Sequence, residues 1–112
     1  MAEKKESTEF EIKFFENILK ERPDFIEALI ALGDLYTKAG FFEKGLEVDL
    51  RLCCLRPDDG VMFYNLACDQ SLLNHINAAF AALAKAIGLG YRDWQFMLQD
   101  ADLENLRKDS RF

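Results

Sequence analysis

The sequence predicts an all-α protein made of repeated helical hairpins, and two observations support this fold class. First, two prolines and several apolar or small residues recur at an interval of 34 positions. The matched pairs are Pro23 and Pro57, Leu29 and Phe63, Leu32 and Leu66, Gly33 and Ala67, Gly45 and Ala79, and Leu46 and Phe80. Second, no segment alternates apolar and polar residues over the length of a strand. A fixed period of this length indicates stacked helical units.

The first two helices are predicted from their apolar spacing and their end signals. Thr8 begins the first helix, and Glu11 three residues later is its partner in a capping box. This helix stops at Pro23, because proline lacks the amide proton that a helix interior needs. Asp24 is expected to cap the second helix, which ends at Gly40.

The remaining helices follow from the same kinds of signal. A third helix is expected over 42–55, a fourth over 61–73, and a fifth over 76–87, which ends at Gly88 or Gly90. The turn at 58–60 supplies a capping acid for the fourth helix. Two short helical segments are expected at 94–98 and 103–108, preceded by Asp93 and Asp102.

The composition describes a globular chain with an acidic balance. Half of the 112 residues are hydrophobic, and the formal net charge is −6. This charge argues against unspecific binding to nucleic acid or to an anionic membrane, and it weakly favours basic partners. No apolar stretch reaches the roughly 18 residues that a membrane span needs. The polar first residues and the odd number of cysteines, three, lead us to expect no secretory signal, no disulfide framework and a cytoplasmic location.

The recurring residues resemble the tetratricopeptide repeat (TPR), a hairpin of two helices. The first complete unit reads Leu29-x2-Leu32-Gly33-x2-Tyr36, followed by Gly40, Gly45 and Pro57, and the second reads Phe63-x2-Leu66-Ala67, followed by Ala79, Leu83 and Ala86. Small residues stand where paired helices would approach closely, and large residues fill the space between them. The resemblance implies an α-α superhelix of about 2.5 repeats with a C-terminal helical cap.

We therefore expect one TPR-like domain that follows a flexible tail. The expected parts are a tail at 1–7, a half repeat at 8–22, repeats at 24–57 and 58–90, and a cap at 91–112. The units are degenerate, since Asp49 stands at a usual aromatic site, Leu52 at a usual alanine, Gln70 at a usual tyrosine, and Tyr91 replaces the closing proline. The cap resembles the closing segment of many bacterial members, which implies a bacterial source.

No residue pattern points to catalysis, a metal site or a cofactor. The soft ligands Cys53, Cys54, Cys68 and His75 lack the spacing of zinc sites, and adjacent cysteines on a helix point about 100° apart. Catalysis by Cys68 and His75 would need a helix end, a loop and a third orienting group to converge. We interpret the cysteines as small packed side chains.

The resemblance implies that the first helix of each repeat lines a concave groove, so the leading hypothesis is a non-enzymatic protein–protein interaction module. The expected groove residues are Glu27, Ile30, Asp34, Thr37, Lys38, Val61, Tyr64, Asn65, Cys68, Ser71 and Leu72. Ile30 and Asp34 stand where a clamp for a peptide carboxylate would need a cation and an amide, so that clamp is not expected. The face instead suits a peptide or helix with apolar and basic side chains. The alternative is a shallow groove partly filled by the chain's own ends.

A second hypothesis, from a different class, is a self-assembling scaffold unit, most simply a homodimer. The half repeat leaves Phe10 and Phe14 without the inner helix that would cover them. The helix at 76–87 carries a single lysine, so its apolar surface, including Ala81 and Ala84, needs a cover on more than one side. The alternative is a monomer in which these side chains are satisfied internally.

Overall fold

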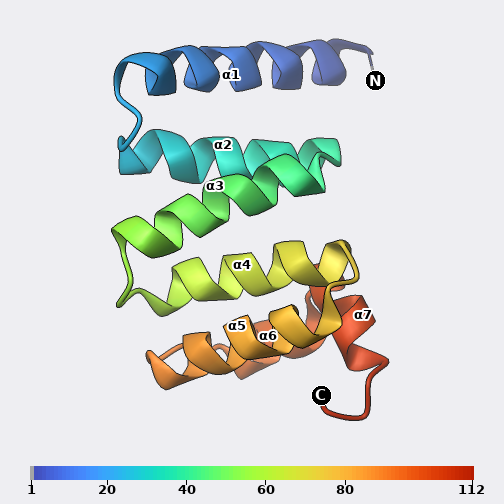
Figure 1. The fold of residues 1–112 in the computed structure, drawn as a ribbon. Helices are drawn as coiled ribbons and strands as arrows, with labels where there is room; N and C mark the ends of the chain where they lie inside the picture. Colours follow the sequence, from blue (N-terminus) through green and yellow to red (C-terminus); the bar gives the residue numbers. More distant parts are fainter. Residues whose placement is uncertain (1) are drawn as a thin grey trace. The chain divides into compact units, whose positions relative to one another are not determined.

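The computed structural model describes the backbone of residues 2–112 and the side chains from Ser7 onward, and all of its elements are helical (Figure 1). The chain divides into two compact units, Met1–Leu55 and Arg56–Phe112. The first unit contains α1 (Ala2–Glu21), α2 (Ile26–Ala39) and α3 (Phe42–Leu55), and the second contains α4 (Gly60–Leu72), α5 (Ile76–Gly88), α6 (Trp94–Gln99), the 3-10 helix η1 (Ala101–Leu103) and α7 (Glu104–Arg107). The all-α fold class is confirmed for residues 2–112, whereas the expected single domain at 8–112 stays a prediction.

In the first unit, α2 packs against both α1 and α3, and successive helices run in opposite directions (Figure 1). Its core is built around Ile12, Leu32 and Tyr36, with Phe15, Leu19, Leu35 and Val48 packed against them. The Tyr36 hydroxyl donates a hydrogen bond to the Glu16 carboxylate, which joins α1 to α2. Burial and this hydrogen bond raise the pKa of the Tyr36 phenol above its ordinary value.

Gly33 marks the close approach of α2 and α3 that the repeat pattern predicts. A Cβ at this position would lie 3.2 Å from the Asp49 Oδ1 atom and 3.3 Å from the Val48 Cγ1 atom. These distances are tighter than ordinary van der Waals contact, so a Cβ at this position would require the Asp49 and Val48 side chains to move by a few tenths of an ångström. The requirement for a small residue therefore has a direct steric cause.

Two of the predicted helix starts are wrong. Of the expected tail at 1–7, Met1 lies outside the described residues, and the backbone is helical from Ala2, because alanine, glutamate and lysine fill this stretch and have high helix propensity. Thr8 therefore lies inside α1 and is not its cap. Asp24 does not cap α2 either, since Phe25 is the N-cap residue and the Asp24 carboxylate pairs with Arg51 of α3.

The other end signals of these helices behave as predicted. α3 spans the predicted residues, Phe42–Leu55. Gly40 ends α2 in the left-handed conformation, with φ of 85°, which glycine adopts without steric cost. At the start of α4, the Asp59 carboxylate accepts a hydrogen bond from the Val61 amide at 2.9 Å. These signals act within a few residues of the chain, so the sequence alone is sufficient to read them.

In the second unit, α4 and α5 form the second hairpin, and the segment from α6 to α7 packs back on it. Ala79 and Ala86 of α5 are fully buried, as expected for close helix packing. Asp93 caps α6 through the Phe96 amide, at 3.1 Å. The predicted helix at 103–108 corresponds to α7, whose N-cap residue is Leu103, and the 3-10 helix η1 before it is capped by Asp100, whose side chain accepts from the Asp102 amide.

No helix in the described part of the chain combines the length and the apolarity that a bilayer crossing requires.

Candidate partner-binding site

Five of the predicted groove residues lie on one face of α2, in the first unit. Glu27, Ile30, Asp34 and Lys38 are exposed, and Thr37 is half-buried because its hydroxyl donates to the Gly33 carbonyl at 3.1 Å. Asp34 and Lys38 form an exposed ion pair with an N–O distance of 2.9 Å, and this hydrogen bond raises the pKa of Lys38. The face thus presents an apolar side chain between two carboxylates.

The other six predicted residues lie on α4, in the second unit, and their exposure differs sharply. Val61 is exposed, Asn65 and Leu72 are half-buried, and Tyr64, Cys68 and Ser71 are buried. Their burial coincides with the packing of η1 and α7 against α4. The C-terminal segment therefore covers part of the surface that the sequence assigned to a partner.

Asp100 is the residue that holds the C-terminal segment to α4. The Tyr64 hydroxyl donates to the Asp100 Oδ2 atom at 2.6 Å, and the Cys68 thiol donates to the same atom at 3.7 Å. The Tyr64 ring also stacks on Tyr91, with ring centres 4.3 Å apart and planes 6° apart, and meets Phe96 at 6.1 Å. One carboxylate thus accepts two hydrogen bonds from successive turns of the same helix.

Further contacts extend this attachment along α4. The Asn105 amide donates to the Ser71 carbonyl at 2.8 Å. Leu103 and Leu106 are fully buried, so the segment is held by apolar packing as well as by polar contacts. A role for Tyr64, Cys68 and Ser71 in partner binding stays a prediction, and it would require this segment to leave α4.

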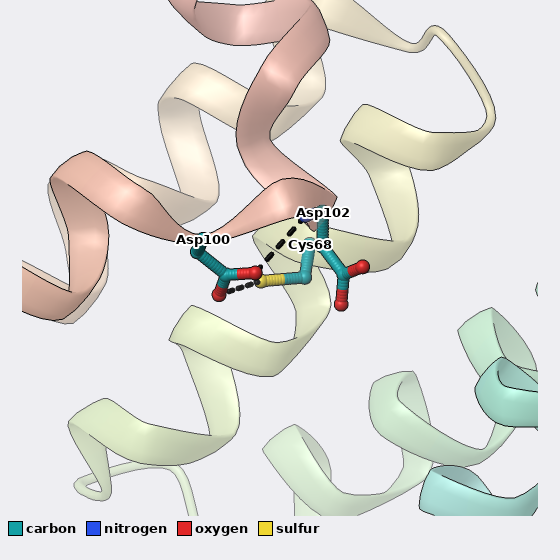
Figure 2. Close-up of side chains that lie close together, drawn as sticks. All are labelled: Cys68, Asp100 and Asp102. Carbon is teal, nitrogen blue, oxygen red and sulfur yellow. Dashed lines mark hydrogen bonds between the residues drawn. The ribbon is translucent and has the colours of Figure 1, made fainter.

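Cys68, Asp100 and Asp102 bring three possible metal-ligating atoms within 4.8 Å of one another. Figure 2 shows the two carboxylates on either side of the Cys68 side chain. Burial, and then the charges of Asp100 and Asp102, raise the pKa of the Cys68 thiol well above its ordinary value. The thiol is therefore protonated at neutral pH and serves as a hydrogen-bond donor. Asp100 joins the three residues, since its carboxylate accepts from the Cys68 thiol and from the Asp102 backbone amide.

The stability of the chain is expected to fall as the pH rises above about 9. The pKa values of Cys68, Tyr64 and Tyr36 are all raised in the folded state, each chiefly by burial. In the unfolded chain, cysteine and tyrosine have pKa values of about 8.5 and about 10. As the pH rises, the unfolded state therefore loses these protons before the folded state does. The stabilisation is complete below those unfolded values, begins to be lost as the pH rises above them, and continues to fall toward the higher pKa values of the folded state.

Urea unfolding followed by circular dichroism between about pH 7 and about pH 10.5 checks this prediction. The midpoint should decrease over this range, and Tyr64→Phe should make the decrease shallower. Substitution of the exposed Cys54 by serine is the control and should leave the pH dependence unchanged. A midpoint that stays constant up to about pH 10.5 would contradict the prediction.

The sequence did not identify Asp100 or Tyr91 as site residues. Asp100 has no repeat partner and lies 32 residues after Cys68, so no local spacing links the two. The one signal available was Tyr91 at the position of a closing proline, since a large aromatic residue there needs a ring or an apolar surface to pack on.

Part of the chain is similar to a plant protein. It is 36% identical over 80 residues to a chloroplastic protein of Arabidopsis thaliana, and the alignment covers 69% of this chain and 24% of that protein. The chain therefore spans about a quarter of that relative's length. No protein-family model matches the chain.

The fold is also found among solved structures. The crystal structure of MamA matches with a TM-score of 0.70 and 23% sequence identity, covering 87% of this chain and 61% of that chain. At this identity the likeness shows the fold alone. Together with the helices packed in adjacent pairs, it establishes that the chain has a TPR-like helical repeat fold.

Proposed function

We propose that this protein is a non-enzymatic interaction module that binds a peptide or helix of a partner protein on the exposed face of α2. The observation that carries the proposal is Ile30, an apolar side chain that is 42% exposed between the carboxylates of Glu27 and Asp34. An exposed apolar residue with acidic neighbours is suited to a partner that offers apolar and basic side chains. The TPR-like fold supports this proposal by analogy only.

We propose that three of the six predicted residues on α4 contribute to partner binding. Val61, Asn65 and Leu72 retain exposed surface, and they are the predicted residues of α4 that a partner can reach. Tyr64 and Cys68 are engaged by Asp100, so they are expected to position the C-terminal segment rather than to contact the partner.

A catalytic role for Cys68 is disfavoured by its surroundings. A nucleophilic cysteine needs a lowered pKa, because the thiolate is the reactive form. Here burial and the neighbouring carboxylates raise the pKa instead. We therefore assign no nucleophilic role to Cys68.

The binding face is tested by two substitutions on α2 and one matched control. Ile30→Ser and Asp34→Arg should each reduce partner recovery in a quantitative affinity purification from the native cells. Leu50→Ser on α3 is the control, since Leu50 is 45% exposed, close to the value for Ile30, and lies outside the proposed face. A set of partners recovered equally with all three variants would contradict the proposal.

A second candidate function is a self-assembling scaffold unit, most simply a homodimer. The observation that favours it is the exposure of Phe10 (72%) and Phe14 (51%) one turn apart on α1. Ala81 and Ala84 of α5 are exposed as well. Large aromatic side chains left in water on one helix face are typical of a surface that another protein molecule covers.

The cellular location is part of the proposal. The sequence suggests a reducing cytoplasm, because three cysteines, two of them adjacent, do not form a disulfide framework, and we propose that location. The bacterial source rests on the resemblance of the C-terminal cap and stays a prediction.

A further inference from the structure

The second unit contains an apolar pocket between α5 and the C-terminal residues. Its volume is about 370 Å³, within the range of sites that accept small ligands or side chains of a partner. The lining residues are Phe80, Leu83, Ala84, Ile87, Trp94, Met97, Leu98, Arg111 and Phe112. Trp94, Leu98 and Phe112 are also exposed, so the pocket continues into an apolar surface.

Two arginines border this pocket. The Arg111 guanidinium lies 4.6 Å from the centre of the Phe80 ring, and the Arg92 guanidinium lies 5.7 Å from that of Trp94. Asp109 shares the charge of Arg111 through paired hydrogen bonds. Arg92 donates instead to backbone carbonyls, those of Ile87 at 2.7 Å and Tyr91 at 2.9 Å. Its positive charge therefore remains at the edge of the pocket, in a chain whose net charge is −6.

The first unit presents a surface of complementary character. Phe10 and Phe14 stand four positions apart and therefore on the same face of α1. Among the side chains that the structure describes, from Ser7 onward, the exposed charged residues beside them are Glu9, Glu11 and Lys13, so carboxylates outnumber ammonium groups there. The surface is aromatic with a border that is acidic on balance, whereas the pocket is apolar and has the Arg92 guanidinium at its edge.

We propose that Phe10 and Phe14 of one copy dock into the pocket between α5 and the C-terminal residues of a second copy, with Glu9 and Glu11 of α1 facing Arg92. The inference rests on the self-assembly candidate and specifies its two surfaces. Such an interface is heterologous, because it joins different patches on the two copies.

Charge argues for this arrangement over a symmetric one. Two α1 faces placed against each other would bring together surfaces in which glutamates outnumber lysine. Two pockets placed against each other would bring Arg92 toward its own counterpart. Pairing α1 with the pocket joins opposite charges, and complementary potentials select a register and suppress the alternatives. A second copy of the chain is the favoured occupant of the pocket, because each chain carries both the pocket and the aromatic α1 face that would dock into it.

Sedimentation equilibrium of the whole 112-residue chain over a concentration series tests the proposal. The wild type should exceed the 12.9 kDa mass of one chain as concentration rises. Phe10→Ser/Phe14→Ser should lose this association, and so should Ala84→Glu, which fills the pocket edge and adds a negative charge. Ala78→Glu is the matched control, since Ala78 is an exposed alanine of α5 outside the pocket lining, and it should associate like the wild type.

A mixing experiment distinguishes the heterologous interface from a symmetric one. The double Phe variant keeps an intact pocket, and Ala84→Glu keeps an intact α1 face. An equimolar mixture should therefore form a complex of twice the single-chain mass, although each variant alone stays at the mass of one chain.

Each alternative has its own outcome. A wild type that stays at one-chain mass overturns both this inference and the self-assembly function. Association that survives Ala84→Glu, or a mixture that stays at one-chain mass while the wild type associates, overturns the inference alone.

Glu9→Lys/Glu11→Lys provides a second variant of α1 that keeps the aromatic residues, and it should weaken association without loss of helical circular dichroism. If it associates like the wild type, the assignment of the glutamates is wrong.

Discussion

Replacing Leu103 by alanine is expected to lower the free energy of unfolding by about 2–5 kcal/mol, the range found for large-to-small changes in protein cores. Leu103 is fully buried, and its helix η1 packs on α4. The substitution removes apolar contacts and leaves a cavity, since the segment is also anchored to α4 by Asp100 and has little freedom to collapse. Urea unfolding monitored by circular dichroism gives the measurement.

Leu98→Ala is the control for this experiment, because Leu98 lies in the adjacent helix α6 but is 63% exposed. At concentrations low enough to prevent association, it should change stability by no more than about 0.5 kcal/mol. Equal and small effects of the two substitutions would contradict the view that the C-terminal segment belongs to the core of the second unit.

Replacing Gly60 by alanine is expected to destabilise the chain by about 1–3 kcal/mol, although alanine is the better helix former. A Cβ at Gly60 would lie 2.9 Å from the Ala86 carbonyl oxygen, and also 3.4 Å from the Tyr91 amide nitrogen. Both neighbours are backbone atoms, so they cannot rotate away, and α4 would have to shift relative to the end of α5. Thermal or urea unfolding measures the loss.

Gly88→Ala provides a matched control of opposite sign. Gly88 is the last residue of α5, and a Cβ there would have no neighbour within 4 Å. The substitution should raise stability by up to about 1 kcal/mol, because alanine restricts the unfolded chain and favours the helix. If both substitutions stabilise the protein, the start of α4 does not approach the end of α5 as closely as the structure has it.

Helix ends were predictable wherever the signal and its target are close in sequence. Gly40, Asp59 and Asp93 behave as predicted, because each acts on backbone groups within about three residues. Asp24 is not the cap of α2, since Phe25 occupies that position and the Asp24 carboxylate binds Arg51, 27 positions away. Thr8 fails because the residues before it form a helix themselves. Distant partners and competing propensities therefore decided the incorrect assignments.

The candidate site likewise has one part that the sequence could predict and one part that it could not. The resemblance to the repeat family assigned Glu27, Ile30 and Asp34 to one face of α2, and all three side chains are exposed. It also placed Tyr64 and Cys68 on one face of α4, but it could not show that Asp100 would cover them. The acidic residue lies beyond α5 and α6, so its position depends on how the chain folds back after α5.

The sequence by itself determined the all-α class, the 34-residue period and the small residues at the helix crossings, because these depend on backbone geometry and on side-chain size at regular spacing. Only the tertiary structure decided which helix faces remain open to a partner. Exposure depends on side chains brought together from separate parts of the chain, as Asp100 meets Tyr64 and as α5 meets α6 around the apolar pocket.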